Sequence, residues 1–111
     1  MNLLLAIIVS AAIDSTAIYI GDQTDMHLRA TMEPTEQVAL PRYRDMLIDG
    51  IEIVERTEVD TTVLQDGRVQ LNQTLTLTSF CDSLFFIPAQ PFVNEEDTLW
   101  SDGLSLNVIQ P

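Results

Sequence analysis

Residues 51–78 carry the pattern that most constrains the fold, because two stretches of alternating apolar residues flank a short turn. The apolar side chains of the second stretch are Val69, Leu71, Leu75 and Leu77. All four stand at odd positions, which is the two-residue period of a half-buried β-strand. The first stretch, from Ile51 to Val63, also has its apolar residues mainly at odd positions. The pattern therefore predicts two antiparallel arms that share one apolar face.

The segment Gln65-Asp66-Gly67 determines how these two arms pair. Residues that face each other across antiparallel strands lie on the same face, so odd positions must pair with odd positions. A two-residue loop would pair position 65 with position 68, whereas a three-residue loop pairs Val63 with Val69. Three-residue loops end in a residue with left-handed backbone angles, which glycine adopts without strain. We therefore predict a three-residue hairpin loop with positive φ at Gly67.

Further short segments read as strands separated by turns. Leu84 to Ile87 is apolar and ends at Pro88, and the stretch 104–108 alternates strictly. Pro88 and Pro91 confine the chain between residues 84 and 93 to a sheet edge or a connection. These signals predict a mainly β fold, a small antiparallel β-sandwich or barrel. A chain of 111 residues without repeat or linker fits one domain, residues 1–111.

Residues 21–46 show the weakest regularity in the sequence. The residues that interrupt regular structure there are Gly21, Asp22, Asp25, Pro34 and Pro41. Such residues favour turns over strands and helices. We expect an irregular loop or flexible arm, with at most one helical turn within residues 35–40.

The N-terminal twenty residues are apolar and allow three interpretations. The first is a strand from Leu3 to Val9, a turn over residues 10–15 and a second strand over residues 16–20. The second is a secretory signal, which would lack the usual basic residues at its start. The third is a membrane anchor, which would place Asp14 within the span. We favour the first, with the run serving as a core or interface segment.

Seven consecutive apolar side chains cannot all face one small core, so we expect a neighbouring subunit to cover part of this run. The predicted interface residues are Leu3, Leu4, Leu5, Ile7, Ile8 and Val9.

The charge of the chain limits its partners. Seventeen Asp and Glu residues stand against five basic residues, all arginine, for a formal net charge of −12. Nucleic acid is excluded as a partner by this balance, because its phosphates require clustered basic side chains. A strongly acidic surface favours solubility at high salt, which indicates a saline or marine source, with compositional drift as the alternative.

Motifs for catalysis or cofactor binding are absent from the sequence. There is no Gly-rich phosphate loop, no paired Cys-x-x-Cys and no histidine cluster, so we expect no cofactor and no enzymatic activity. Cys81 is the single cysteine and His27 the single histidine, and nothing in the sequence brings them together. We expect Cys81 to be a buried core residue.

Calcium is the one metal for which the sequence offers candidate ligands. Its candidate ligands are Glu95, Glu96, Asp97 and Asp102. Their oxygens suit calcium, but their spacing matches no calcium-binding loop. A solvated turn explains the same residues.

These observations together favour a non-enzymatic structural subunit of a larger protein assembly, homo- or hetero-oligomeric. Virion components such as decoration, cement or tail-joining proteins are the class of subunit that we expect, and this step is an analogy that the residues themselves do not derive. The alternative is a secreted or membrane-tethered β-domain binding module that uses residues 1–20 as its signal or anchor.

Overall fold

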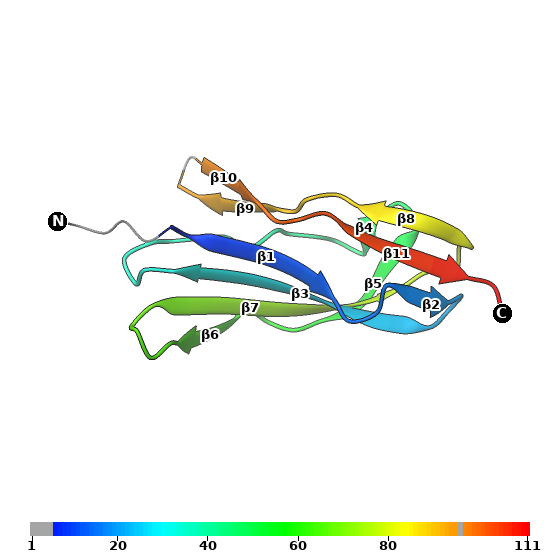
Figure 1. Cartoon of the computed structure of the whole chain (residues 1–111), viewed down its shortest axis with the longest axis horizontal. Coiled ribbons are helices and arrows are strands. Elements are labelled where there is room, and N and C mark those ends of the chain that lie inside the picture. The colour runs from blue at the N-terminus through cyan, green and yellow to red at the C-terminus, as the bar shows by residue number, and fades with distance from the viewer. Residues whose placement is uncertain (1–5, 96) are drawn as a thin grey trace.

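The computed structural model describes residues 6–95 and 97–111, and all regular elements within them are β-strands (Figure 1). The first sheet contains, in spatial order, β1 (Ile8–Ile13), β3 (Gln23–Met32), β7 (Val69–Thr78), β5 (Ile51–Arg56) and β4 (Met46–Ile48). A sixth strand of this sheet, β6 (Asp60–Val63), pairs with the other end of β7. A three-stranded sheet has the order β2 (Ala17–Tyr19), β11 (Leu104–Ile109) and β8 (Ser83–Ile87). A two-stranded sheet pairs β9 (Pro91–Asn94) with β10 (Asp97–Trp100).

The two smaller sheets pack on the six-stranded sheet through a shared core, so the predicted mainly β fold, a small antiparallel β-sandwich or barrel, is confirmed. All strand pairs are antiparallel except β2 with β11, which are parallel. Buried side chains from both layers form the core, including Met26, Leu28, Leu75 and Leu77 from the large sheet and Phe92, Leu106 and Val108 from the small ones.

The paired strands β3 and β7 set the long axis of the molecule. They pair over ten residues, from Gln23 opposite Thr78 to Met32 opposite Val69. At about 3.3 Å per residue this ladder is roughly 33 Å long. The molecule measures 57 × 22 × 22 Å, and its radius of gyration of 15.5 Å exceeds the roughly 13 Å expected for a compact chain of this length.

The predicted hairpin is confirmed. Val63 pairs with Val69, the Leu64 N–H donates to the Arg68 carbonyl at 2.8 Å, and Gly67 has a φ of 87°. The shared apolar face, however, is buried only at the β5 end. Leu75 and Leu77 are fully buried, whereas Val63 is 71% exposed because no strand of the second layer covers the hairpin tip.

The first arm of the hairpin is broken into two strands, β5 and β6. The pairing of β5 with β7 shifts register between Ile53 and Glu55, and β6 starts four residues after β5 ends. Between them, Thr57 donates its N–H to the Thr74 carbonyl, and its hydroxyl accepts the Thr74 N–H, both at 3.0 Å. The connection therefore stays attached to β7 at one point only.

The prediction of an irregular segment over residues 21–46 is wrong for residues 23–32, which form β3. The apolar residues Met26, Leu28, Ala30 and Met32 alternate with polar ones, so a strand signal was present. The polar residues Asp25, His27 and Arg29 concealed it, because they lie on the outer face of the sheet rather than in a loop. Residues 33–45 are irregular as expected, with a single bridge between Ala39 and Val93 and no helical turn.

At the N-terminus the predicted strand and turn are displaced. β1 begins at Ile8 and continues to Ile13, through the predicted turn, and the chain turns at residues 14–16. The reason is the alternation of Ile7, Val9, Ala11 and Ile13, which pack against the core. Ile7 and Val9 are thus partly covered by their own domain, and Ile8 is exposed on the other face. The predicted interface residues Leu3, Leu4 and Leu5 lie outside the described residues.

Residues 6–95 and 97–111 include no helix with the length and apolarity that crossing a membrane requires.

Candidate interaction surface

The outer face of the three-stranded sheet is the strongest candidate for a functional surface. Cross-strand pairing places Asn107 between Leu84 and Ala17, Phe86 beside Ser105, and Ile109 beside Tyr19. Paired residues lie on the same side of a sheet, and so do residues two apart in one strand. We call this set the uncharged face; it consists of Ala17, Tyr19, Leu84, Phe86, Ser105, Asn107 and Ile109.

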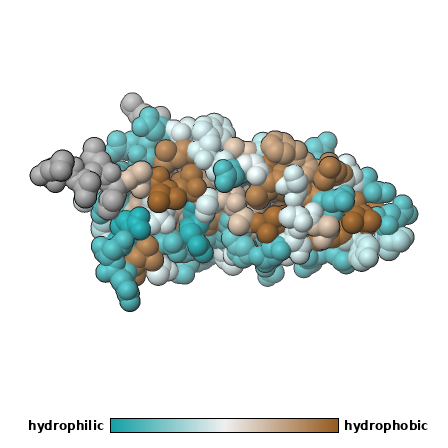
Figure 2. Space-filling model, viewed as in Figure 1, coloured by the Kyte–Doolittle hydropathy of each residue, from teal (hydrophilic) through white to brown (hydrophobic). Residues whose placement is uncertain are grey.

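Large apolar side chains on the uncharged face are open to solvent. Leu84 is 71% exposed, Phe86 67%, Tyr19 54% and Ile109 39%. The alternate residues of the same strands, Ile18, Ile87, Leu106 and Val108, are buried in the core. Figure 2 shows hydrophobic surface over β8 and β11. The strands are therefore apolar on both faces, a pattern typical of sheets that are covered on both sides.

No charged residue belongs to the uncharged face, although the chain carries 17 acidic and five basic residues. Contiguous apolar patches that are exposed on a protein surface mark interaction sites, whereas single apolar residues scattered over a surface are normal. A hollow of about 600 Å³ adjoins the patch; Ala17, Tyr19 and Ile109 line it on the side of the patch, and its remaining lining includes Ser15, Asp22 and Gln23. It offers space for a side chain of a partner.

Gly103 determines how the ring of Phe86 lies on this surface. A Cβ atom at Gly103 would stand 2.9 Å from Phe86 Cζ and 3.1 Å from Cε2. The φ angle of Gly103 does not require glycine, so the close approach of the ring is the reason for the residue. One edge of the ring therefore rests against the backbone just before β11, while Phe86 as a whole stays 67% exposed.

The outer face of the six-stranded sheet has the opposite character. Its side chains bond to one another across β3 and β7: Thr76 Oγ1 donates to Asp25 at 2.7 Å, and Arg29 Nε donates to Asn72 at 2.8 Å. Such a ladder satisfies its own polar groups and is typical of a solvated sheet face.

One row on this polar face resembles a catalytic arrangement. Asp14 Oδ1 lies 2.9 Å from His27 Nε2, and His27 Nδ1 lies 3.1 Å from Thr74 Oγ1. A carboxylate, an imidazole and a hydroxyl in this order can activate an oxygen nucleophile. Here, however, the Thr74 N–H already donates to Thr57 Oγ1 and cannot stabilise a developing oxyanion. No sequence motif indicates this row, because His27 is 13 residues from Asp14 and 47 residues from Thr74.

Cys81 is exposed, so the prediction that it is buried is wrong. Phe80 beside it is exposed as well, because β7 ends at Thr78 and the chain turns before β8 begins. Residues outside a strand do not alternate between two faces, which removes the basis of the prediction. His27 pairs with Thr74, which lies four residues, or about 13 Å, before the end of β7 at Thr78. Cys81 lies beyond that end, so Cys81 and His27 belong to different regions of the molecule.

The weak calcium candidates are not brought together. Asp97 starts β10 and Asp102 lies two residues after its last residue, Trp100, so the length of the strand, roughly 10 Å, separates them. Glu95 lies in the turn before β10 with a φ of 52°, and Glu96 lies outside the described residues. Within residues 6–95 and 97–111, no three His, Cys, Asp or Glu side chains are grouped to hold a metal ion.

No protein-family model matches this sequence, and neither a curated protein nor a solved structure matches it.

Proposed function

We propose that this chain is a non-enzymatic structural subunit of a larger protein assembly, and that it joins its neighbours through the uncharged face. The observation that carries the proposal is the exposure of Leu84 and Phe86 on a charge-free sheet face of a protein with a net charge of −12. Charged residues are depleted at the centres of protein interfaces, where aromatic residues are enriched. The uncharged face has both properties.

Burial of this face would provide substantial stabilisation. Complete burial of a leucine or phenylalanine side chain contributes about 1.5–3 kcal/mol. Four large side chains on the face are between 39% and 71% exposed, so a partner could bury the equivalent of about two such residues. That gain offsets part of the cost of association, and backbone or polar contacts at the rim would have to supply the rest.

Particles built from many copies of small β domains are the kind of assembly that this shape fits, and virion decoration, cement or tail-joining proteins are the nearest functional analogy. The long 22 Å-wide form supports side-by-side packing. The alternative, a secreted or tethered binding module, would use residues 1–20 as a signal or anchor. Because β1 and β2 pair with β3 and β11, loss of those residues would remove two strands of the domain.

Sedimentation equilibrium from micromolar to millimolar concentration tests the proposal. We expect the wild-type chain to associate, and Leu84→Glu to weaken association at least tenfold because a carboxylate would be desolvated in the contact. Val63→Glu is the matched control, since Val63 is also 71% exposed but lies on β6 of the other sheet.

Two results would contradict the proposal. One is a wild-type chain that stays a single copy at every concentration and also has a single-chain mass in extracts of its source. The other is equal weakening of association by Leu84→Glu and Val63→Glu.

A further inference from the structure

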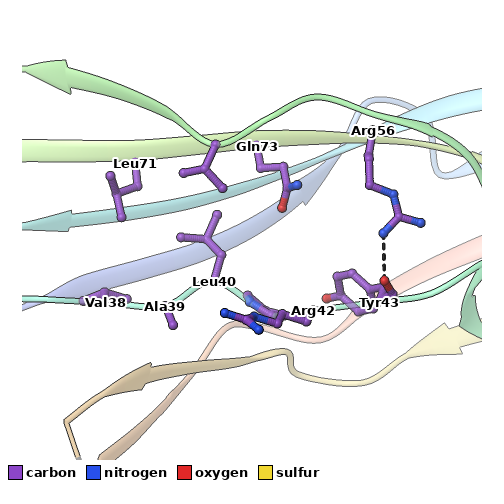
Figure 3. A pocket seen from close by; sticks show the side chains of 10 residues that line it. Val38, Ala39, Leu40, Arg42, Tyr43, Arg56, Leu71 and Gln73 are labelled. Carbon is purple, nitrogen blue, oxygen red and sulfur yellow. Dashed lines mark hydrogen bonds between the residues drawn. The ribbon is translucent and has the colours of Figure 1, made fainter.

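A groove of about 420 Å³ lies between the irregular segment 38–43 and the strands of the hairpin (Figure 3). Its apolar lining comes from Val38, Leu40 and Pro41 on one wall and from Val59 and Leu71 on the other. It exists because the break between β5 and β6 leaves the chain near Val59 away from the core. Ligand pockets in proteins have volumes of about 300–1,000 Å³, and this groove falls within that range.

Two positively charged side chains line the groove, one from each wall (Figure 3). Arg42 and Arg56 line it, and no acidic residue among those described does so. Arg44 follows the groove residue Tyr43 in the sequence, so three of the five basic residues of the chain lie in or beside the groove. The ion pairs formed among the described residues are Asp14–His27 and Asp66–Arg68. Neither includes Arg42 or Arg56, so no carboxylate among the described residues neutralises either guanidinium charge.

Hydrogen bonds hold the part of the groove around Arg56 and Tyr43 in place. Arg56 donates Nη1 to the Tyr43 carbonyl at 2.8 Å and Nη2 to the Arg44 carbonyl. The Tyr43 hydroxyl donates to Gln90 Oε1, and the Gln90 N–H donates to Ser101 Oγ at 2.8 Å. Burial raises the pKa of the Tyr43 phenol well above its usual value, so the hydroxyl remains a donor. A site held in this way loses little freedom on binding.

Gln73 adds a polar group to the wall formed by β7. Its Nε2 donates to the Thr57 carbonyl at 2.9 Å, and in Figure 3 its side-chain oxygen points toward the opposite wall. The oxygen is placed to accept an N–H from the backbone of a bound segment.

We propose that this groove binds an extended peptide segment of a partner protein, with an aliphatic side chain between Leu40 and Leu71 and a neighbouring Asp or Glu carboxylate at Arg42, where Arg56 adds positive charge from the opposite wall. The apolar walls fit the aliphatic group, and the unpaired guanidinium charges fit the carboxylate. The side-chain oxygen of Gln73 can accept a backbone N–H, which a peptide has and a free amphiphile such as a fatty acid lacks. The site is separate from the uncharged face, so the two proposals can fail independently.

NMR titration of the full chain with the blocked peptide acetyl-Ala-Leu-Glu-Leu-Ala-amide tests the proposal. We expect shift changes at residues that line the groove, and affinity about tenfold higher than for the peptide with Gln in place of Glu. Arg42→Gln should lower affinity for the Glu peptide about tenfold and remove the preference between the two peptides. Arg29→Gln removes the same charge from the polar face of β3 and should leave the affinity unchanged.

Three outcomes would overturn the proposal: equal affinity for the two peptides, equal effects of Arg42→Gln and Arg29→Gln, or shift changes away from the groove. Decanoate is the comparison probe for a free amphiphile. Binding of decanoate in the groove without binding of the peptide would also overturn it.

Discussion

The turn between β6 and β7 permits a quantitative test, because the requirement for glycine at position 67 rests on backbone angles alone. Gly67 has a φ of 87°, and an added Cβ atom would meet no other atom within 4 Å. Replacement by a larger residue thus introduces strain without a clash. We expect Gly67→Val to lower the free energy of unfolding, since β-branched residues resist left-handed angles.

The size of the effect follows from the cost of the left-handed conformation. That cost is about 1–2 kcal/mol for an ordinary residue and up to about 3 kcal/mol for a strained one. Asparagine tolerates these angles better, so Gly67→Asn should cost less than about 1 kcal/mol. The four residues of β6 are all exposed, and local opening of the hairpin sets an upper limit on the cost of any variant. We therefore expect about 2 kcal/mol for Gly67→Val.

Urea unfolding of the wild type and both variants measures these differences. Amide hydrogen exchange at Leu64 and Gly67, whose N–H groups bond within the turn, reports whether the hairpin opens locally. Equal stability of Gly67→Val and Gly67→Asn, with unchanged exchange at Leu64, would refute the reasoning from backbone angles.

Three further predictions concern the surface. Cys81 should react with a thiol reagent in the native state as fast as in urea, because it is exposed, and protection in the native state would contradict the structure. Molar sodium chloride should raise the melting temperature by screening a net charge of −12, and a flat or falling midpoint would remove the inference of a saline source. The pKa of Asp66 is lowered by hydrogen bonds from the Arg68 backbone N–H and then from its side chain. Its stabilising contribution is therefore present above the ordinary carboxyl pKa and is lost as pH falls through the lowered value; a normal NMR titration of Asp66 would contradict this.

Local patterns predicted the strands whose two faces differ. The alternation in β7 and β11 and the glycine at position 67 could be interpreted without knowledge of their neighbours. The same rule overlooked β3, whose outward side chains Asp25, His27 and Arg29 resemble those of a loop. Their pairing with Thr76, Thr74 and Asn72 makes them part of a ladder, and those partners are more than 40 residues away.

The candidate sites depended still more on distant contacts. Leu84 and Phe86 were predicted to lie in a short apolar strand, but their exposure follows from the order β2-β11-β8, which places them on the outer side of the smaller layer. The groove likewise joins residues 38–43 to Arg56 and Leu71, and no spacing in the sequence indicates that meeting.

The sequence by itself determined the class of fold, the hairpin register and the acidic surface, because turn chemistry, side-chain period and charge are properties of neighbouring residues. Tertiary structure alone decided which apolar residues are buried. A strand that alternates strictly presents one face to whatever layer covers it, and the position of that layer is set by the pairing of β2 with β11 and of β3 with β7. Exposure of the uncharged face and the opening of the groove both result from this arrangement.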